Sequence, residues 1–163
     1  MSLDQWFLSL ENTGVATAVR QSTWLFPTIE TLHVLAITLT AGSIITLDLR
    51  LLNLASRDRG IKGMADEHLP WTWAAFAFAL ITGATLFSSH ALKYEGNFDF
   101  RMKMALLAVA GINMLIFHLG AFRRVALWDT GGATPAAARW AGGISLCLWI
   151  AIIGFGRWIG FTT

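Results

Sequence analysis

Four long apolar runs, separated by polar segments, constrain this chain more than any other feature of its sequence. They cover residues 24–47, 69–89, 104–121 and 140–161. Each has about the 20 residues that an α-helix needs to cross the roughly 30 Å of hydrocarbon in a bilayer. Backbone amides and carbonyls find no hydrogen-bond partners in lipid, so continuous apolar runs of this length are expected to be helices and not barrel strands. The sequence therefore predicts an all-α fold, a four-helix transmembrane bundle.

The rest of the chain fits a single integral membrane domain over residues 1–163. Hydrophobic residues make up 55% of the sequence and charged residues only 13%, against about 25% charged in an average soluble domain. Leu3, Trp6, Phe7 and Leu10 recur at helical spacing, which predicts an N-terminal amphipathic helix at the membrane interface. The formal net charge of +2 is small and its charges are scattered, which argues against nucleic acid as a partner.

Basic residues predict how the bundle is oriented. The two segments after the first and third runs, with the helix ends beside them, hold seven Lys and Arg residues against five elsewhere: Arg50, Arg57, Arg59, Lys62, Arg123, Arg124 and Arg139. Lys and Arg are enriched in cytoplasmic loops of membrane proteins. We therefore expect these two segments in the cytoplasm and both termini on the opposite side.

All four histidines lie within the apolar runs or at their ends. His33 is inside the first run, His68 and His90 stand at the start and end of the second, and His118 is near the end of the third. Neutral imidazole is the usual axial ligand of haem iron, and helix bundles hold such sites between facing helices. We predict a b-type haem between His33 and His90 on the outer side, with His68 and His118 as a second candidate pair on the cytoplasmic side. This geometry favours a second helix that continues through His90, which no helix breaker before Gly96 prevents. The alternative for each histidine is a hydrogen bond to a carbonyl or a place among headgroups.

Charged residues accompany this predicted site. Glu30 precedes His33 by one helical turn on the same face, where it could orient the imidazole or exchange a proton. Arg157 interrupts the last run and could hold a haem propionate or a quinone oxygen, with snorkelling to the interface as the alternative. Asp48 and Lys103 are expected to be interfacial anchors or members of interhelical ion pairs. No residue is assigned a catalytic role.

Several motifs resemble known families. Pro27-Thr-Ile-Glu30-Thr-Leu-His33, then Ala41-Gly42 and Asp48-Leu-Arg50-Leu-Leu, resemble the first helix of an uncharacterised family of small four-helix bacterial membrane proteins. Phe100-Arg-x-Lys103 and the segment from Asn113 to His118 extend that resemblance over most of the chain. The first helix alone is more distantly similar to the copper-resistance D family and to membrane-bound protoporphyrinogen oxidases. The resemblance implies a bacterial inner-membrane protein with haem or metal handling.

These observations favour a membrane-embedded b-type haem electron-transfer subunit. It would link a quinone or a cytoplasmic electron donor to an extracytoplasmic partner, as one subunit of a larger complex in the bacterial inner membrane. Two alternatives stay open: a copper or other metal permeation or assembly module that uses the histidines as ligands, and a non-redox membrane anchor for a periplasmic enzyme.

Overall fold

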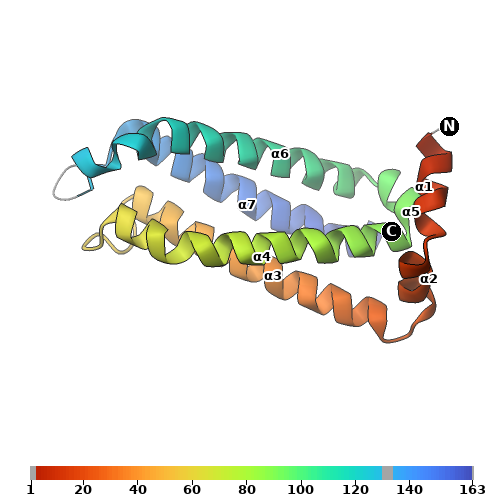
Figure 1. The fold of residues 1–163 in the computed structure, drawn as a ribbon. Coiled ribbons are helices and arrows are strands. Elements are labelled where there is room, and N and C mark those ends of the chain that lie inside the picture. The colour runs from red at the N-terminus through yellow and green to blue at the C-terminus, as the bar shows by residue number, and fades with distance from the viewer. Residues whose placement is uncertain (1–2, 130–133, 163) are drawn as a thin grey trace.

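The computed structural model describes residues 3–129 and 134–162, and over these residues it confirms the predicted fold class. The helices, in chain order, are α1 Leu3–Glu11, α2 Gly14–Gln21, α3 Leu25–Leu51, α4 Ile61–Ser89, α5 Ala91–Glu95, α6 Phe98–Leu119, the 3₁₀ helix η1 Ala121–Leu127, and α7 Ala136–Thr162. The described residues contain no β-strand. Four helices, α3, α4, α6 (which the span search joins to η1) and α7, are long and apolar enough to cross a membrane, which indicates a multi-pass membrane protein (Figure 1).

The long helices extend beyond the apolar runs that predicted them. α3 continues to Leu51 instead of ending at residue 47, and α4 begins at Ile61 instead of residue 69. The added first turns of α4 are polar and are held by local contacts, because Lys62 Nζ lies 2.7 Å from Asp66 Oδ2 and the Asp129 carboxylate accepts the backbone N–H of Ile61. Hydropathy reports the lipid-facing part of a helix, and these polar turns are stabilised by capping and charge pairing instead.

α4 ends at Ser89, so the prediction that it continues through His90 is wrong. His90 has φ −147° and ψ 51°, outside the helical region, and the short helix α5 begins at Ala91. The last turn of α4 is tightened, since the Ser89 hydroxyl donates to the Leu86 carbonyl at 2.7 Å and the His90 N–H donates to the Phe87 carbonyl at 3.2 Å. His90 therefore sits at a corner between two helices.

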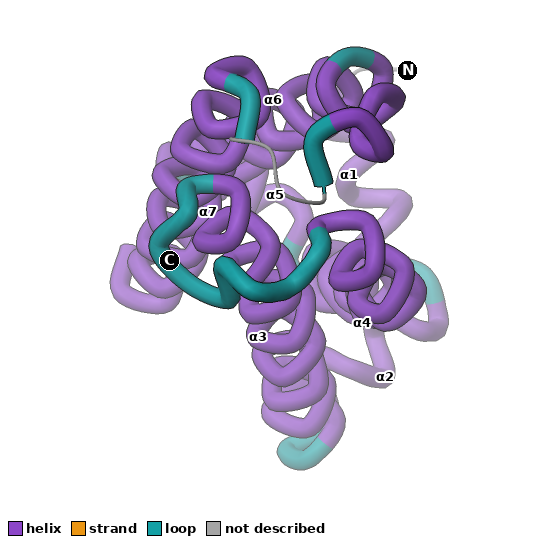
Figure 2. Tube along the Cα trace, turned by 90° about the vertical axis from the view of Figure 1, so that its left-hand side faces the viewer, coloured by secondary structure: helices purple, strands orange, loops and turns teal. Residues whose placement is uncertain are grey.

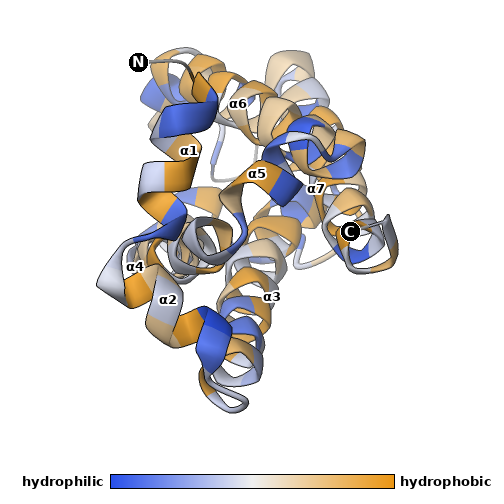
Figure 3. Cartoon of the chain, turned by 90° about the vertical axis from the view of Figure 1, so that its right-hand side faces the viewer, coloured by the Kyte–Doolittle hydropathy of each residue, from blue (hydrophilic) through white to orange (hydrophobic). Residues whose placement is uncertain are grey.

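The N-terminal segment forms two short helices, α1 and α2, where the sequence predicted one. The side chain of Thr13 caps the first turn of α2. Two contacts fix this pair to the bundle: Glu11 Oε1 accepts the Leu92 N–H at 3.0 Å, and Arg20 Nη1 donates to the Ser89 carbonyl at 3.3 Å. Figure 3 looks onto this end and shows hydrophilic segments in α1 and α2 beside the mostly apolar long helices.

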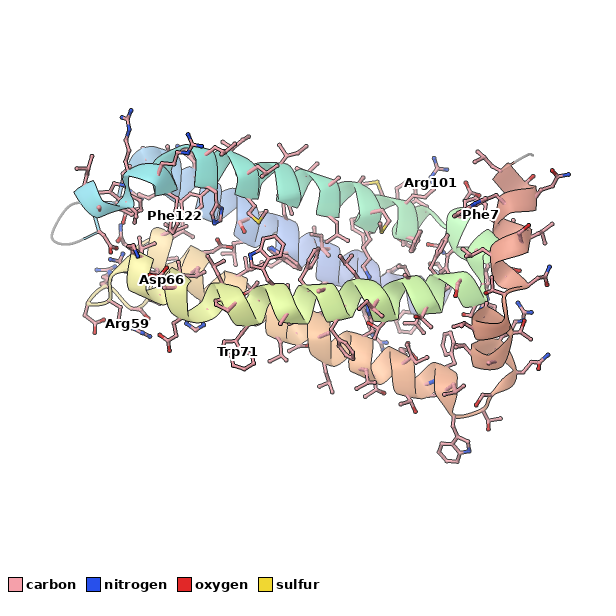
Figure 4. All side chains as sticks on the ribbon, in the orientation of Figure 1. Phe7, Arg59, Asp66, Trp71, Arg101 and Phe122 are labelled. Carbon is pink, nitrogen blue, oxygen red and sulfur yellow. The ribbon has the colours of Figure 1, made fainter. Side chains whose placement is uncertain are left out.

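The bundle has two distinct ends. Both chain termini lie at one of them with α1, α2 and α5 (Figure 1); we call it the terminal end. The opposite end, which we call the loop end, holds residues 52–60 and η1. Figure 4 shows Arg59 and Asp66 at the loop end and Phe7 at the terminal end, with Trp71 pointing away from the bundle. This arrangement agrees with the expectation that both termini share one side of the membrane.

The four long helices form an arc. α4 packs on α3, α3 on α7, and α7 on α6, an order that is visible from the loop end (Figure 2). α3 and α7 cross closely, because a Cβ added at Gly142 would lie 3.0 Å from Leu51 Cβ and 3.2 Å from the Asp48 carbonyl oxygen. On the remaining side, no Cα of α4 lies within 8 Å of a Cα of α6, both of which are described along their whole length.

Candidate functional site

A cavity of about 190 Å³ lies among the four long helices, in the half of the bundle nearer the loop end. Most of its wall is aliphatic or aromatic, and its largest side chains are Trp73, Phe76, Phe117 and Trp149. The polar side chains in the wall are Thr40 and Asp48 of α3, Thr72 of α4, Asn113 and His118 of α6, and Ser145 of α7. All four helices thus contribute polar groups to one membrane-level cavity.

Asp48 is the most unusual residue of this cavity. The residue is only 4% exposed, and its carboxyl oxygen Oδ2 has no hydrogen-bond partner among the described residues. The carboxyl of Asp48 does hydrogen-bond to the side chain of Ser145 of α7, which also lines the cavity. A buried polar atom that lacks a partner destabilises a protein by about 1–3 kcal/mol, and more if the group is charged. Such exceptions are rare in folded proteins, and an ionisable group inside a membrane is a candidate functional group.

His118 lies in the same wall with a defined tautomer. Its Nδ1 is 3.0 Å from the Met114 carbonyl oxygen, which can only accept, so Nδ1 carries the proton of the neutral imidazole. Phe117 and Phe122 hold the ring, with centroids 5.5 and 5.1 Å from that of His118. Nε2 is therefore left as a hydrogen-bond and proton acceptor.

Three other polar groups of the wall, those of Thr40, Thr72 and Asn113, donate to the backbone. The Thr40 hydroxyl donates to the Ala36 carbonyl and the Thr72 hydroxyl to the His68 carbonyl, both at 2.9 Å. Asn113 Nδ2 donates to the carbonyl oxygen of Ala141 at 3.0 Å and so ties α6 to α7. Asp48 Oδ2 and His118 Nε2 therefore keep unused hydrogen-bond capacity, while Ser145 is paired with the Asp48 carboxyl.

His33, the first predicted haem ligand, is packed directly against α4. Its Nδ1 lies 3.0 Å from Thr82 Oγ1, and the ring also hydrogen-bonds to the backbone of Ala79. A Cβ at Gly83 would lie 2.9 Å from His33 Cε1. The glycine therefore makes room for the imidazole, and no gap remains between this ring and α4.

His90, the second predicted ligand, lies in a different environment at the terminal end. Its Nδ1 is 3.0 Å from Ser89 Oγ, and its ring packs edge-on near Phe26 and Tyr94. His33 contacts α4 at Gly83, and by helical rise His90 is about 10 Å farther along that helix. The structure thus separates the two histidines along the bundle axis.

The remaining predicted residues are also dispersed. Glu30 is exposed on α3; burial raises the pKa of the Tyr94 phenol, and the Glu30 carboxylate adds to that increase. His68 is half-buried on α4 and does not line the cavity that His118 lines. Arg157 is exposed, with its guanidinium carbon 4.9 Å from the centre of the Phe161 ring. Within the part of the chain that the structure describes, no three His, Cys, Asp or Glu side chains are grouped to hold a metal ion.

Comparison with known proteins places the chain in a family. Residues 20–162 match the model of a "Family of unknown function (DUF6644)". The chain belongs to this family. No curated protein and no solved structure matches this DUF6644 chain. The match agrees with the resemblance to an uncharacterised family, and the comparisons add no support for the more distant similarity to the copper-resistance D family or the oxidases.

Sequence reasoning found His118 but missed Asp48 as a member of the site. Asp48 lies near the end of an apolar run, where a charged side chain is usually interfacial. One signal was present: Thr40, Ile44 and Asp48 are spaced four residues apart, so they share one face of α3. That spacing places Asp48 with the apolar interior, and only the packing of α7 against that face buries it.

Proposed function

We propose that this DUF6644 protein is a quinone-binding subunit of a membrane redox complex. The observation that carries this proposal is a buried carboxyl oxygen without a hydrogen-bond partner, Asp48 Oδ2, in the same apolar cavity as the accepting nitrogen of His118. Ligand pockets are typically apolar with a few polar groups that fix the ligand's orientation, and this cavity has that composition.

The size of the cavity favours a ligand head with one ring. An engineered apolar cavity of about 150 Å³ binds benzene, so about 190 Å³ accommodates one substituted six-membered ring. A porphyrin, which contains four pyrrole rings, requires the helices to move apart. The dimensions therefore support the quinone that we predicted as a partner more directly than they support haem.

The chemistry of the two polar groups suits the reduced form of such a ring. A quinol has two hydroxyl donors, and the Asp48 carboxylate and His118 Nε2 are two acceptors. When a quinol is oxidised to a quinone, two protons and two electrons leave the ring. Asp48 and His118 would each take one proton, and the two electrons would pass one at a time to a one-electron acceptor in another subunit.

Haem b on His33 and His90 stays a prediction of the sequence. It needs His33 to leave its contact with Gly83, and it needs the two histidines to reach a common iron from positions that the structure separates. Metal permeation through the histidines and a purely anchoring role stay alternatives. For the quinone-binding subunit, we propose the bacterial inner membrane as the location, with the loop end in the cytoplasm.

Binding of a short-chain quinone to the purified protein in lipid nanodiscs tests the proposal. Trp73 and Trp149 line the cavity, so a bound quinone should quench tryptophan fluorescence in a saturable manner. Asp48→Asn keeps the volume of the side chain but removes the charge that strengthens its hydrogen bond to a quinol. We expect the quinol Kd to rise about tenfold, the equivalent of roughly 1.4 kcal/mol.

Asp66→Asn is the matched control, because Asp66 is exposed on α4 at the loop end and does not line the cavity. This variant should keep the wild-type Kd. Absence of saturable quenching in the wild type, or equal effects of the two substitutions, would show that Asp48 does not bind a quinol.

A further inference from the structure

On the side of the bundle between α4 and α6, the two backbones are not in close contact. Packed helices usually lie 8–10 Å apart, axis to axis, which brings facing Cα atoms within 8 Å, as on the other three sides of the arc. Between α4 and α6, two fully described helices, no Cα pair comes this close. Figure 1 looks onto this side of the bundle. We call this gap between the two helix backbones the α4–α6 window.

Contacts close the window at both ends. At the terminal end, α5 packs against both helices, and the ring of Phe87 on α4 stacks on that of Phe100 on α6 with centroids 5.2 Å apart. At the loop end, η1 packs against α4 and α6, and Val125 and Trp128 join a buried cluster with Ile61. The window therefore lies at the depth of the hydrocarbon and is closed toward either aqueous side.

The cavity reaches the side of the window, where α4 and α6 supply both apolar side chains and the polar groups of Thr72, Asn113 and His118. α4 and α6 supply an aromatic and thioether wall that includes Phe76, Met114 and Phe117. The carboxyl of Asp48 belongs to α3, and the hydroxyl of Ser145 belongs to α7, the pair of helices opposite the window. A ring held between Asp48 of α3 and His118 of α6 leaves the part of the wall with Phe76 and Met114 for an apolar tail.

We infer that the ligand of this cavity enters and leaves sideways from the bilayer, through the α4–α6 window, and that its prenyl tail lies in the window while the ring is bound. This inference rests on the proposed function. It adds a class of ligand to that function, namely a tailed quinone that is already dissolved in lipid. Because the window is closed toward water at both ends, the remaining route to the cavity is from the lipid. The side chain of Met114 is flexible and can adapt to a chain that passes it.

Gly111 of α6 provides a way to block the route. It lines the cavity, and a Cβ added there meets no atom within 4 Å, so a larger side chain can fill open space without displacing a neighbour. Gly154 of α7 is the matched control, because its added Cβ is equally free of contacts and it is not in the cavity wall.

The experiment compares two probes by stopped-flow tryptophan quenching in nanodiscs: decylubiquinone, which has a tail, and ubiquinone-0, which has none. In Gly111→Leu, the association rate and the dissociation rate of decylubiquinone should both fall about tenfold, because the same route serves entry and exit. A substitution that changed only the contacts with the bound ligand would alter mainly the dissociation rate. Ubiquinone-0 should be slowed less, since no tail has to occupy the window. Gly154→Leu should keep wild-type rates for both probes.

Each other outcome overturns a defined part of the inference. If the wild type binds decylubiquinone and Gly111→Leu leaves its rates unchanged, lateral access is wrong and the proposed function stands. If the wild type shows no saturable binding of either probe, the proposed function and lateral access both fail. Should Gly111→Leu not fold, Gly111→Ala adds one methyl group to the same space and must slow decylubiquinone in the same direction; unchanged rates there overturn the inference.

Discussion

Two buried aspartates differ in what surrounds them. Asp99, in the first turn of α6, accepts a hydrogen bond from the Thr162 hydroxyl at 2.7 Å, which connects the start of α6 to the end of α7. Asp48 is equally buried, but its Oδ2 has no partner. One carboxyl thus stabilises the bundle, and the other destabilises it at a place where a ligand can bind.

This difference predicts opposite effects of the same substitution. Asp48→Leu removes the unpartnered Oδ2 together with one hydrogen bond to Ser145, so it should raise the free energy of unfolding by only about 1 kcal/mol. Asp99→Leu removes a satisfied hydrogen bond and a favourable charge at a helix N-terminus, and should lower it by about 1–2 kcal/mol. Thermal unfolding of the purified variants in detergent measures both. A loss of stability in Asp48→Leu as large as that in Asp99→Leu would indicate that Asp48 has a structural role.

The residue types of the site were easier to predict from the sequence than their grouping. Rarity in an apolar run singled out His33 and His118, and this signal is physical because polar groups are costly in lipid. Which polar side chains come together in one cavity depends on how each helix is rotated about its axis and on how closely α3 approaches α7. Neither can be predicted from the sequence of a single helix. Hence His118 lies with Asp48 in one cavity, while His33 packs on Gly83.

At the scale of elements, apolar length predicted the four spans but not their ends. The ends depend on specific contacts, such as the Asp129 carboxylate at the start of α4 and Asn97, whose side chain accepts the Phe100 N–H at 2.9 Å to begin α6. No helix-breaking residue in the sequence predicted the end of α4 before His90. It follows from the way α5 turns to meet both α4 and α6.

The crossing of α3 and α7 depends on one glycine of an adjacent pair. A Cβ at Gly142 would lie 3.0 Å from Leu51 Cβ, whereas at Gly143 the nearest neighbour, Leu52 Cδ2, is 3.7 Å away. Gly142→Ala should therefore push α7 from α3 and cost about 1–3 kcal/mol by overpacking. Gly143→Ala should be neutral or slightly stabilising, because alanine favours a helix. Thermal unfolding decides between them, and equal midpoints for the two variants would refute a tight crossing at Gly142.

At the scale of the whole molecule, the cavity exists because the four spans form an arc rather than a closed square. Each span buries one face against a neighbour and exposes the rest, as Leu39 and Ile116, both more than half exposed, illustrate. Those faces contact lipid in a membrane, so the arc needs no water-soluble surface. The sequence predicted four spans with both ends of the chain on one side. Four helices with that topology can pack as an arc or as a closed square, and only their tertiary packing distinguishes the two arrangements.

The orientation of the whole molecule rests on its basic residues and can be tested without changing any of them. Asp58 at the loop end and Glu95 at the terminal end are both exposed, and neither is Lys or Arg. Single cysteines are introduced at these positions in a Cys147→Ser background, since Cys147 is itself exposed.

Because the loop end holds the larger share of Lys and Arg, it should stay in the cytoplasm. A membrane-impermeant maleimide added to intact bacterial cells should then label Glu95→Cys, and it should label Asp58→Cys only after the cells are opened. The reverse pattern would place Asp48 and His118, which lie nearer the loop end, toward the periplasm. Protons released from a quinol in the cavity would then leave on the outer side, so this labelling experiment also fixes the side of the membrane with which the proposed site exchanges protons.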